Sequence, residues 1–429
     1  MHARGPRQGR AEGGFPAFRA LQNRNFRLLW TGLAVSAVGT WMQIVAQSLL
    51  VLDLTHGSAA ALGALSLAQA TAFLLFAAVG GSVADRFDKR RLLMLTQSLM
   101  MGFAILLGVL TATGAVRFWM VLVVAFSSSA TLSFDQPTRN ALIASAVPKE
   151  HLMNAISLQA AVFNGASIFG PALAGLALSR IGYSGNFFLN AVSFFAVLAA
   201  LLLLRVPRAD GTARPGGPLL DSAREALRYV RRDAVLPSVV AAYGALLLFG
   251  PSAALTLPLF TEQILHAGPT QLGMLFSAVG GGTVIGALVI ASLGDFSHKR
   301  RLLFGSILLW TVALALFGSS ASLLVSVPAL FIMGAAQNAA GATTVTLLQT
   351  RVPPEMRGRA MSLNTLLIMC VRPMGDFPAG ALIGRLGFRT TVLLGATLVG
   401  TTVVTLLLAA RPSGAVKSEA HPRLNEKEW

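Results

Sequence analysis

The sequence predicts an all-α integral membrane protein whose twelve transmembrane helices form two pseudo-symmetric six-helix bundles. Three observations support this prediction. The 429-residue chain is 54% hydrophobic but only 12% charged, whereas soluble domains are about a quarter charged. Its uncharged runs are long enough to cross a bilayer, which takes about 20 apolar residues in a helix. Finally, the second half of the chain repeats short motifs of the first half.

The first half contains six runs without Asp, Glu, Lys or Arg. Because the runs are continuously apolar and do not alternate with polar residues, they predict helices and exclude a membrane barrel. The runs cover residues 28–52, 54–84, 92–116, 118–134, 151–179 and 181–204.

The second half also provides six helices. Its uncharged runs cover residues 234–261, 263–294, 302–350 and 390–410. The run 302–350 is long enough for two helices, and we place their break at the small and polar residues Gly318–Ser322. An eleventh helix over about 360–384 is apolar except for Arg372 and Asp376.

Basic residues predict the orientation of these helices. Of the 34 lysines and arginines, 29 lie in the two tails and in loops that twelve crossings place on one side. Loops rich in Lys and Arg stay in the cytoplasm, so we expect cytoplasmic termini in a bacterial cytoplasmic membrane. The net charge of +17 then sets topology and attracts anionic membrane lipids, and it does not require a nucleic-acid partner.

These assignments divide the chain into five parts. We expect a cytoplasmic tail at 1–27, a bundle at 28–205, a cytoplasmic linker at 206–233, a second bundle at 234–410 and a cytoplasmic tail at 411–429. The linker begins rich in Pro and Gly. Its later part, Leu219–Arg232, is amphipathic and is expected to lie as a short helix along the membrane surface.

An internal repeat relates the two bundles. The segment Lys89–Leu93 recurs as Lys299–Leu303, and Leu62-Gly63 recurs as Leu272-Gly273. Repeats separated by six helices run parallel and are related by an axis along the membrane normal. Such duplication predicts a substrate cavity between the halves, near the middle of the membrane.

Several motifs resemble the major facilitator superfamily. The segment Gly81–Arg91 resembles the family's motif between helices 2 and 3, with Asp88 in place of a glycine. Gly170–Gly175 is similar to the Gly-Pro-x-x-Gly-Gly motif of its proton-coupled drug exporters, although Ala174 replaces a glycine and helix 4 lacks their central arginine. Three further segments resemble a bacterial branch of the family that includes the enterobactin exporter: Arg24–Trp30, Gly39–Gln43 and Phe134–Arg139. The likeness covers about residues 20–410.

The resemblance implies two halves that rock against each other, with a gate on the cytoplasmic side. In this gate Asp85 would hold the halves together and pair with Arg139, while Arg86 and Arg90 anchor the loop. The alternative is that these basic residues only set topology. Gly170, Pro171 and Gly175 would form a hinge or seal in helix 5, and the alternative there is simple packing of small residues.

Ionisable residues inside the membrane are the sharpest functional candidates. Arg372 and Asp376 are four residues apart, so they share one helix face. An unpaired charge at this depth costs at least about 2.5–3.5 kcal/mol. The pair is predicted to carry proton coupling or substrate binding, with a structural ion pair as the alternative. Asp135 is a second protonation candidate, although its place near the inner end of helix 4 also suits a gate.

Neutral polar and aromatic residues are candidates for lining the cavity. By resemblance, helices 1, 4, 7 and 10 surround it. The candidates are Trp41, Gln43 and Gln47 on helix 1, Tyr243 on helix 7, and Gln337 and Asn338 on helix 10. For each, the alternative is a contact between helices or a place in the core. Together they suit an amphipathic substrate.

The sequence gives little indication of catalysis, metal binding or nucleotide binding. With one cysteine, Cys370, and six scattered histidines, the chain offers no disulfide framework and no metal-ligand spacing. It has no phosphate-binding Gly-x-x-x-x-Gly-Lys loop, no catalytic set and no expected cofactor. We therefore predict a monomeric secondary transporter, a proton-coupled exporter of a small amphipathic molecule such as a siderophore, antibiotic or drug. An importer or facilitator is the alternative, and a membrane sensor or enzyme is a third reading.

Overall fold

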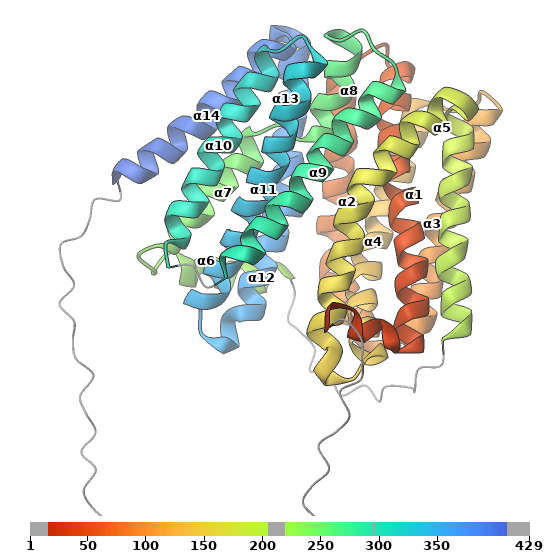
Figure 1. The fold of residues 1–429 in the computed structure, drawn as a ribbon. Coiled ribbons are helices and arrows are strands. Elements are labelled where there is room, and N and C mark those ends of the chain that lie inside the picture. Colours follow the sequence, from red (N-terminus) through yellow and green to blue (C-terminus); the bar gives the residue numbers. More distant parts are fainter. Residues whose placement is uncertain (1–15, 205–218, 295–296, 410–429) are drawn as a thin grey trace, which may run out of the picture.

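The computed structural model describes residues 16–204, 219–294 and 297–409. Every regular element within these ranges is a helix (Figure 1). Eleven helical segments are long and apolar enough to cross a membrane. One of them, Leu152–Leu203, turns at Gly182, whose φ of 67° interrupts the helix. Because that segment supplies two crossings, the described residues form the twelve crossings that the sequence predicts.

The first half consists of one long helix for each crossing except the last two, which share α5. The break expected between residues 179 and 181 therefore falls at Gly182. The elements are η1 (Pro16–Gln22), α1 (Arg24–Leu54), α2 (Ala59–Arg86), α3 (Lys89–Ala112), α4 (Phe118–Ala146), η2 (Lys149–His151) and α5 (Leu152–Leu203).

The second half contains more interruptions than the first. The pair α7–α8 makes one crossing, and the series α12–η4–α13 makes another. The elements are α6 (Leu219–Val230), α7 (Leu236–Phe249), α8 (Ala253–Gln263), α9 (Pro269–Leu293), α10 (Lys299–Ser319), α11 (Leu323–Arg351), η3 (Pro354–Met356), α12 (Arg357–Leu366), η4 (Leu367–Val371), α13 (Arg372–Leu386) and α14 (Phe388–Ala409). The expected break at 318–322 is confirmed, because α10 ends and α11 begins there.

Two of these interruptions were not expected. The helix predicted over 234–261 breaks at Gly250–Ser252, between α7 and α8. Pro251 has no N–H group to donate and cannot continue the helix. The helix predicted over 360–384 contains the π-helical turn η4, directly before Arg372, and such turns often occur at functional positions.

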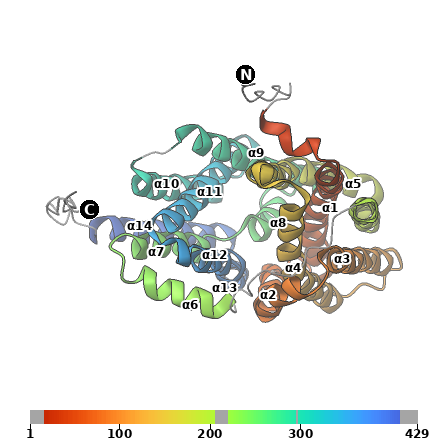
Figure 2. The same ribbon diagram turned by 90° about the horizontal axis from the view of Figure 1, so that it is seen from below.

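The two halves pack against each other mainly through α5 with α9 and α2 with α13. Figure 2 shows α1–α5 on one side and α7 and α10–α14 on the other. We call the end that holds η1, α6 and α12 the linker face, and the opposite end the far face. Glycines permit the close approach near the far face: Gly175 meets the backbone of Pro269, and Gly63 meets the backbone of Phe377.

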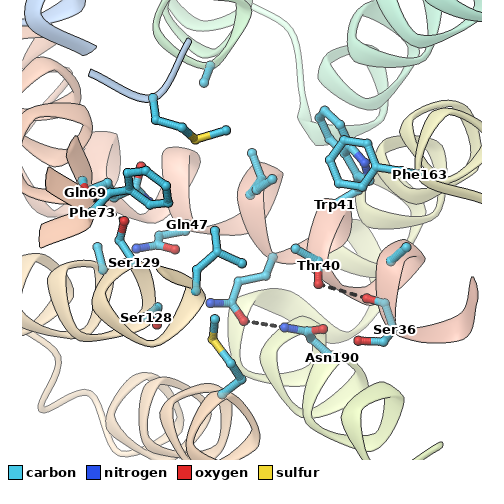
Figure 3. A pocket seen from close by; sticks show the side chains of 18 of the residues that line it. Ser36, Thr40, Trp41, Gln47, Gln69, Phe73, Ser128, Ser129, Phe163 and Asn190 are labelled. Carbon is cyan, nitrogen blue, oxygen red and sulfur yellow. Dashed lines mark hydrogen bonds between the residues drawn. The ribbon is translucent and has the colours of Figure 1, made fainter. Parts of the chain in front are cut away.

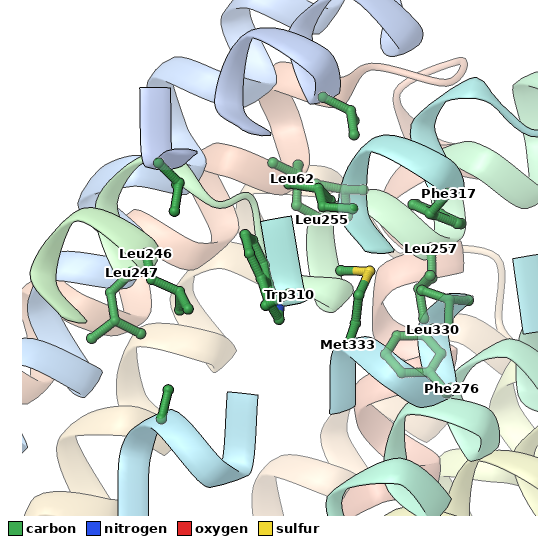
Figure 4. Close-up of a cluster of buried hydrophobic side chains, with 14 of the residues drawn as sticks. Leu62, Leu246, Leu247, Leu255, Leu257, Phe276, Trp310, Phe317, Leu330 and Met333 are labelled. Atoms are coloured by element: carbon green, nitrogen blue, oxygen red, sulfur yellow. The ribbon is translucent and has the colours of Figure 1, made fainter. Parts of the chain in front are cut away.

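The interior of the second half is filled by large apolar side chains. Trp310 is 1% exposed and packs against Gly250 at the break between α7 and α8. Leu246, Leu255 and Met333 belong to the same buried cluster (Figure 4). Because these side chains occupy the centre of the second half, open space at this depth lies mostly on the side of the first half.

The linker helix α6 packs on the protein at the linker face. Its apolar residues Ala223, Ala226 and Val230 are buried, and α6 contacts α12. The carboxylate of Glu225 lies 2.5 Å from the guanidinium of Arg359. The expected amphipathic helix is thus present, with its apolar face turned towards α12.

Asp233 starts the second bundle by capping α7. Its carboxylate accepts hydrogen bonds from the N–H groups of Val235 at 2.7 Å and Leu236 at 2.8 Å, and Arg351 lies 3.7 Å away. Burial acts to raise the pKa of the Asp233 carboxyl, but these backbone donors and the arginine outweigh it and hold the pKa below its ordinary value.

Asp233→Asn is expected to lower the unfolding free energy at neutral pH by about 0.3–1 kcal/mol, because the asparagine oxygen still caps α7 but the negative charge at the helix N-terminus, which also faces Arg351, is lost. Because the folded-state pKa is depressed, the charge stabilises the protein above the unfolded-state pKa. That stabilisation is lost as the pH falls through the folded-state value. Thermal unfolding of the detergent-solubilised protein at neutral and acidic pH measures the difference, with Asp221→Asn on α6 as the charge control. An equal difference at both pH values would contradict this role.

Candidate functional site

A cavity of about 460 Å³ lies between the two halves at membrane depth. Most of its lining comes from α1, α2, α4 and α5, while α8, η4 and α13 contribute Ala254, Ile368, Met369 and Pro373. It extends towards the linker face, where Gln159 and Arg139 line it. Amides, hydroxyls and aromatic rings share the wall: Ser36, Thr40, Trp41, Gln43, Gln47, Ser48, Ser66, Gln69, Phe73, Gln97, Ser128, Ser129, Gln159, Phe163, Asn190 and Phe194.

The three candidates on helix 1 do line this cavity. Gln43 accepts a hydrogen bond from the side chain of Asn190 on α5. Trp41 lies beside Phe163, with ring centroids 5.9 Å apart, on the opposite side of the cavity from Gln47 (Figure 3). Gln47 is 6% exposed, and its Nε2 group has no hydrogen-bond partner. Sequence reasoning missed Asn190 and Phe163, because nothing in their local pattern marks the face of α5 that meets α1.

The candidates on helices 7 and 10 lie elsewhere. Tyr243, Gln337 and Asn338 are not among the residues that line the cavity. Tyr243 is 4% exposed, and its hydroxyl packs on Gly341 of α11. The physical reason is the apolar filling around Trp310, which occupies the space that these side chains would otherwise border.

Asp135 is the centre of a buried polar cluster at the linker-face end of the cavity. It is 0% exposed and accepts hydrogen bonds from Thr96 at 2.8 Å and Gln97 at 2.6 Å. Its second oxygen forms an ion pair with Arg139, one turn along α4. These three donors come from α3 and α4 and reach both oxygens of the carboxylate, so its hydrogen-bonding capacity is largely used within the protein.

Arg139 forms an ion pair within this cluster, with Asp135 one turn back along its own helix. Its expected pairing with Asp85 stays a prediction. The side chains of Asp85 and Arg86 lie outside the described residues, so their gate role stays a prediction. Arg90 donates a hydrogen bond to the carbonyl of Leu202 at 2.9 Å, which ties the start of α3 to the end of α5.

Asp376 is the second buried carboxylate and joins three helices. It is 3% exposed and accepts a hydrogen bond from the backbone N–H of Ser252 at 2.8 Å. The Ser66 hydroxyl of α2 lies close to the same carboxylate. Ser252 is the first residue before α8, so the carboxylate satisfies a backbone donor that the break after Gly250 leaves free, and its charge lies at a helix N-terminus.

The expected direct ion pair between Arg372 and Asp376 is not formed. It is not among the ion pairs of the described residues, although the guanidinium lies within electrostatic range of the carboxylate. The backbone of Ser252 takes the place expected for Arg372, whose Nη2 group is buried without a hydrogen-bond partner. The Gly250-Pro251 pair was the sequence signal that could have revealed this free donor.

The helix 5 motif lies where the halves meet. Gly170 packs against Trp41 of α1, the carbonyl of Pro171 faces Gly273 of α9, and Gly175 faces Pro269. The hydroxyl of Ser277 on α9 also donates to the carbonyl of Ile168 at 2.6 Å. These contacts close the two halves against each other between the cavity and the far face.

The described residues offer no metal centre, because no three of their His, Cys, Asp and Glu side chains are grouped to hold an ion. What the arrangement can do is bind. A polar and aromatic cavity of this size accommodates a small amphipathic molecule, and two buried carboxylates, Asp135 and Asp376, lie near its wall.

Comparisons with known proteins agree with this picture. A family model described as transmembrane secretion effector matches residues 15–428. Macrolide efflux protein A of Streptococcus pyogenes is 24% identical over 388 residues, which cover 87% of this chain and 93% of that protein. Enterobactin exporter EntS of Citrobacter koseri is 27% identical over 404 residues, which cover 92% of this chain and 91% of that protein.

The fold also matches solved structures. The crystal structure of nucleoside transporter NupG superimposes with a TM-score of 0.71 over 90% of this chain and 98% of that chain. With 15% sequence identity, this likeness concerns the fold alone.

Proposed function

As a member of the transmembrane secretion effector family, within the major facilitator superfamily, the chain is a multi-pass membrane transporter, and we propose that it exports a small amphipathic molecule in exchange for protons. The observation that carries this proposal is the cavity between the halves, which is closed towards the far face and lined by amides, hydroxyls and aromatic rings. Relatives named for macrolide efflux and enterobactin export support the outward direction.

The orientation of the cavity follows from the basic residues. The chain segments that twelve crossings assign to the side of the linker face carry most of the lysines and arginines, so this face is proposed to be cytoplasmic. The cavity then takes up substrate from the cytoplasm. Separation of α5 from α9 and of α2 from α13 would open it to the other side, which is alternating access by two rocking halves.

Coupling is assigned to Asp376, with Asp135 as the second candidate. An ionised Asp376 accepts a hydrogen bond from Ser252 of the second half and lies beside the Ser66 hydroxyl of the first half. A proton on one carboxyl oxygen removes part of this accepting capacity, so protonation weakens the junction between α2 and α13. Arg372 lies near enough to stabilise the ionised form. Asp135 is held by three donors within the first half, which leaves it less able to join the halves.

Everted membrane vesicles with an imposed proton gradient, acidic inside, test the proposal. We expect wild-type vesicles to accumulate a catecholate siderophore and to dissipate the gradient while they do so. Vesicles without the protein and vesicles treated with a protonophore are the controls. Accumulation in right-side-out vesicles alone would favour the importer, and movement that ignores the gradient would contradict proton coupling.

A further inference from the structure

We propose that the cavity selects uncharged or anionic amphiphiles rich in oxygen atoms and rejects organic cations. This inference rests on the proposed function and names its substrate class. It depends on the charges around the cavity and on polar atoms in its wall that have no partner within the protein.

The charges around the cavity favour neutral and negative molecules. Arg139 is the one charged residue among the described residues that line it, and no carboxylate lines it there. Its counter-ion Asp135 is 0% exposed and already accepts hydrogen bonds from Thr96 and Gln97. A cation in the cavity would therefore meet the guanidinium before it could approach this carboxylate.

The other nearby carboxylate is equally inaccessible. Asp376 is 3% exposed and accepts a hydrogen bond from the Ser252 N–H, with the Ser66 hydroxyl beside it. Arg372 lies close by and adds a second positive charge to this region. An organic cation entering from the linker face would lose its hydration and find no carboxylate among the described residues of the cavity wall, which is a large cost at this depth.

Residues that line the cavity carry polar atoms without a partner, and these atoms indicate which groups a substrate would satisfy once the side chains turn towards it. The Nε1 group of Trp41, the Nε2 group of Gln47 and the Nε group of Arg139 are buried donors without a hydrogen-bond acceptor. A buried donor without a partner is costly, and carbonyl, phenolate or carboxylate oxygens of a substrate would remove that cost.

Two acceptors complete the set. The Oε1 atoms of Gln97 and Gln159 are buried and without a donor, and the amide orientation of Gln97 follows from the bond that its Nε2 group donates to Asp135. These oxygens suit hydroxyl groups. Trp41 and Phe163 stand beside each other in the same wall (Figure 3) and offer an apolar surface for a flat ring, so the cavity matches a hydroxylated, carbonyl-bearing aromatic or macrocyclic molecule.

Two dyes of the same xanthene skeleton test the charge preference. Fluorescein methyl ester is an anion with oxygen acceptors at mildly alkaline pH, whereas rhodamine methyl ester is a cation with N–H donors in the same places. Fluorescence anisotropy measures the binding of each dye to the purified full-length protein in nanodiscs, without any proton gradient. We expect the wild type to bind the anion at least about tenfold more tightly than the cation.

Adding a carboxylate to the cavity should reverse this preference. Gln47→Glu keeps the size of the side chain, and Ser128→Asp places the charge at a more accessible position, where it stays ionised. Each variant is expected to shift the ratio of the two dissociation constants at least about tenfold towards the cation. Gln349→Glu makes the same chemical change at an exposed position of α11 outside the cavity and should leave the ratio unchanged.

The outcomes separate this inference from the proposed function. Equal or tighter binding of the cation by the wild type would overturn the inference, and so would ratios that neither cavity variant changes. Failure of all these proteins to bind either dye would overturn the assignment of this cavity to oxygen-rich amphiphiles. Because binding is measured without a gradient, a protein that fails in proton-driven export can still show the charge preference. A protein that exports with the gradient but binds both dyes equally would lose the inference and keep the proposed function.

Discussion

Asp376→Asn is expected to reduce proton-driven transport at least about tenfold while the protein keeps its fold. The asparagine side chain retains an oxygen that can accept the hydrogen bond from the Ser252 N–H, so the start of α8 stays capped. It cannot take up or release a proton, so the junction with Ser66 of α2 no longer responds to the gradient.

Two measurements separate coupling from structural damage. Gradient-driven accumulation in everted vesicles should collapse in Asp376→Asn, while exchange of labelled for unlabelled substrate without a gradient should continue. Asp376→Ala removes the acceptor as well and is expected to lower the melting temperature in detergent, because the buried Ser252 N–H is then unsatisfied. Unchanged proton-driven transport by Asp376→Asn would remove this residue from the coupling mechanism and leave Asp135 as the remaining candidate.

The helices themselves could be predicted from the sequence because the length of each uncharged, apolar run decides them. A backbone inside a bilayer must satisfy its own hydrogen bonds, so every long uncharged run becomes a helix, and the break between α10 and α11 follows from Gly318–Ser322. The break between α7 and α8 could not be predicted from hydropathy, because the three residues Gly250–Ser252 are too few to interrupt an otherwise apolar span. The free N–H is satisfied by a residue 124 positions away.

The candidate site was predictable only where one helix supplies it. Gln43, Gln47 and Trp41 line the cavity because α1 borders it with a wide arc of its surface, with Gln43 and Gln47 towards one edge of the arc and Trp41 towards the other. Whether Tyr243 reaches the cavity depends on how the second half packs around Trp310, which no local pattern reveals. The spacing of Arg372 and Asp376 predicted that they share a helix face. It could not show whether the Asp376 carboxylate would bind Arg372 or a backbone N–H from a neighbouring helix.

Gly175→Leu is expected to block transport at least about tenfold by preventing the closure seen near the far face. A Cβ atom at Gly175 would meet the backbone of Pro269 and Thr270 on α9. Backbone atoms cannot move aside as a flexible side chain does, so the halves must separate there. The side chain therefore favours the conformation that is open at the far face, and a transporter held in one conformation completes no cycle.

Spin labels at Thr113→Cys and Ser319→Cys, one exposed residue at the far face of each half, report this separation when Cys370 is replaced by alanine. Gly165→Leu is the matched control, because it lies on the same helix and a Cβ atom there meets nothing within 4 Å. Double electron–electron resonance should give a longer distance between the two labels in Gly175→Leu than in the wild type or in Gly165→Leu. Normal transport by Gly175→Leu with an unchanged distance would mean that α5 and α9 need not come this close for the cycle to run.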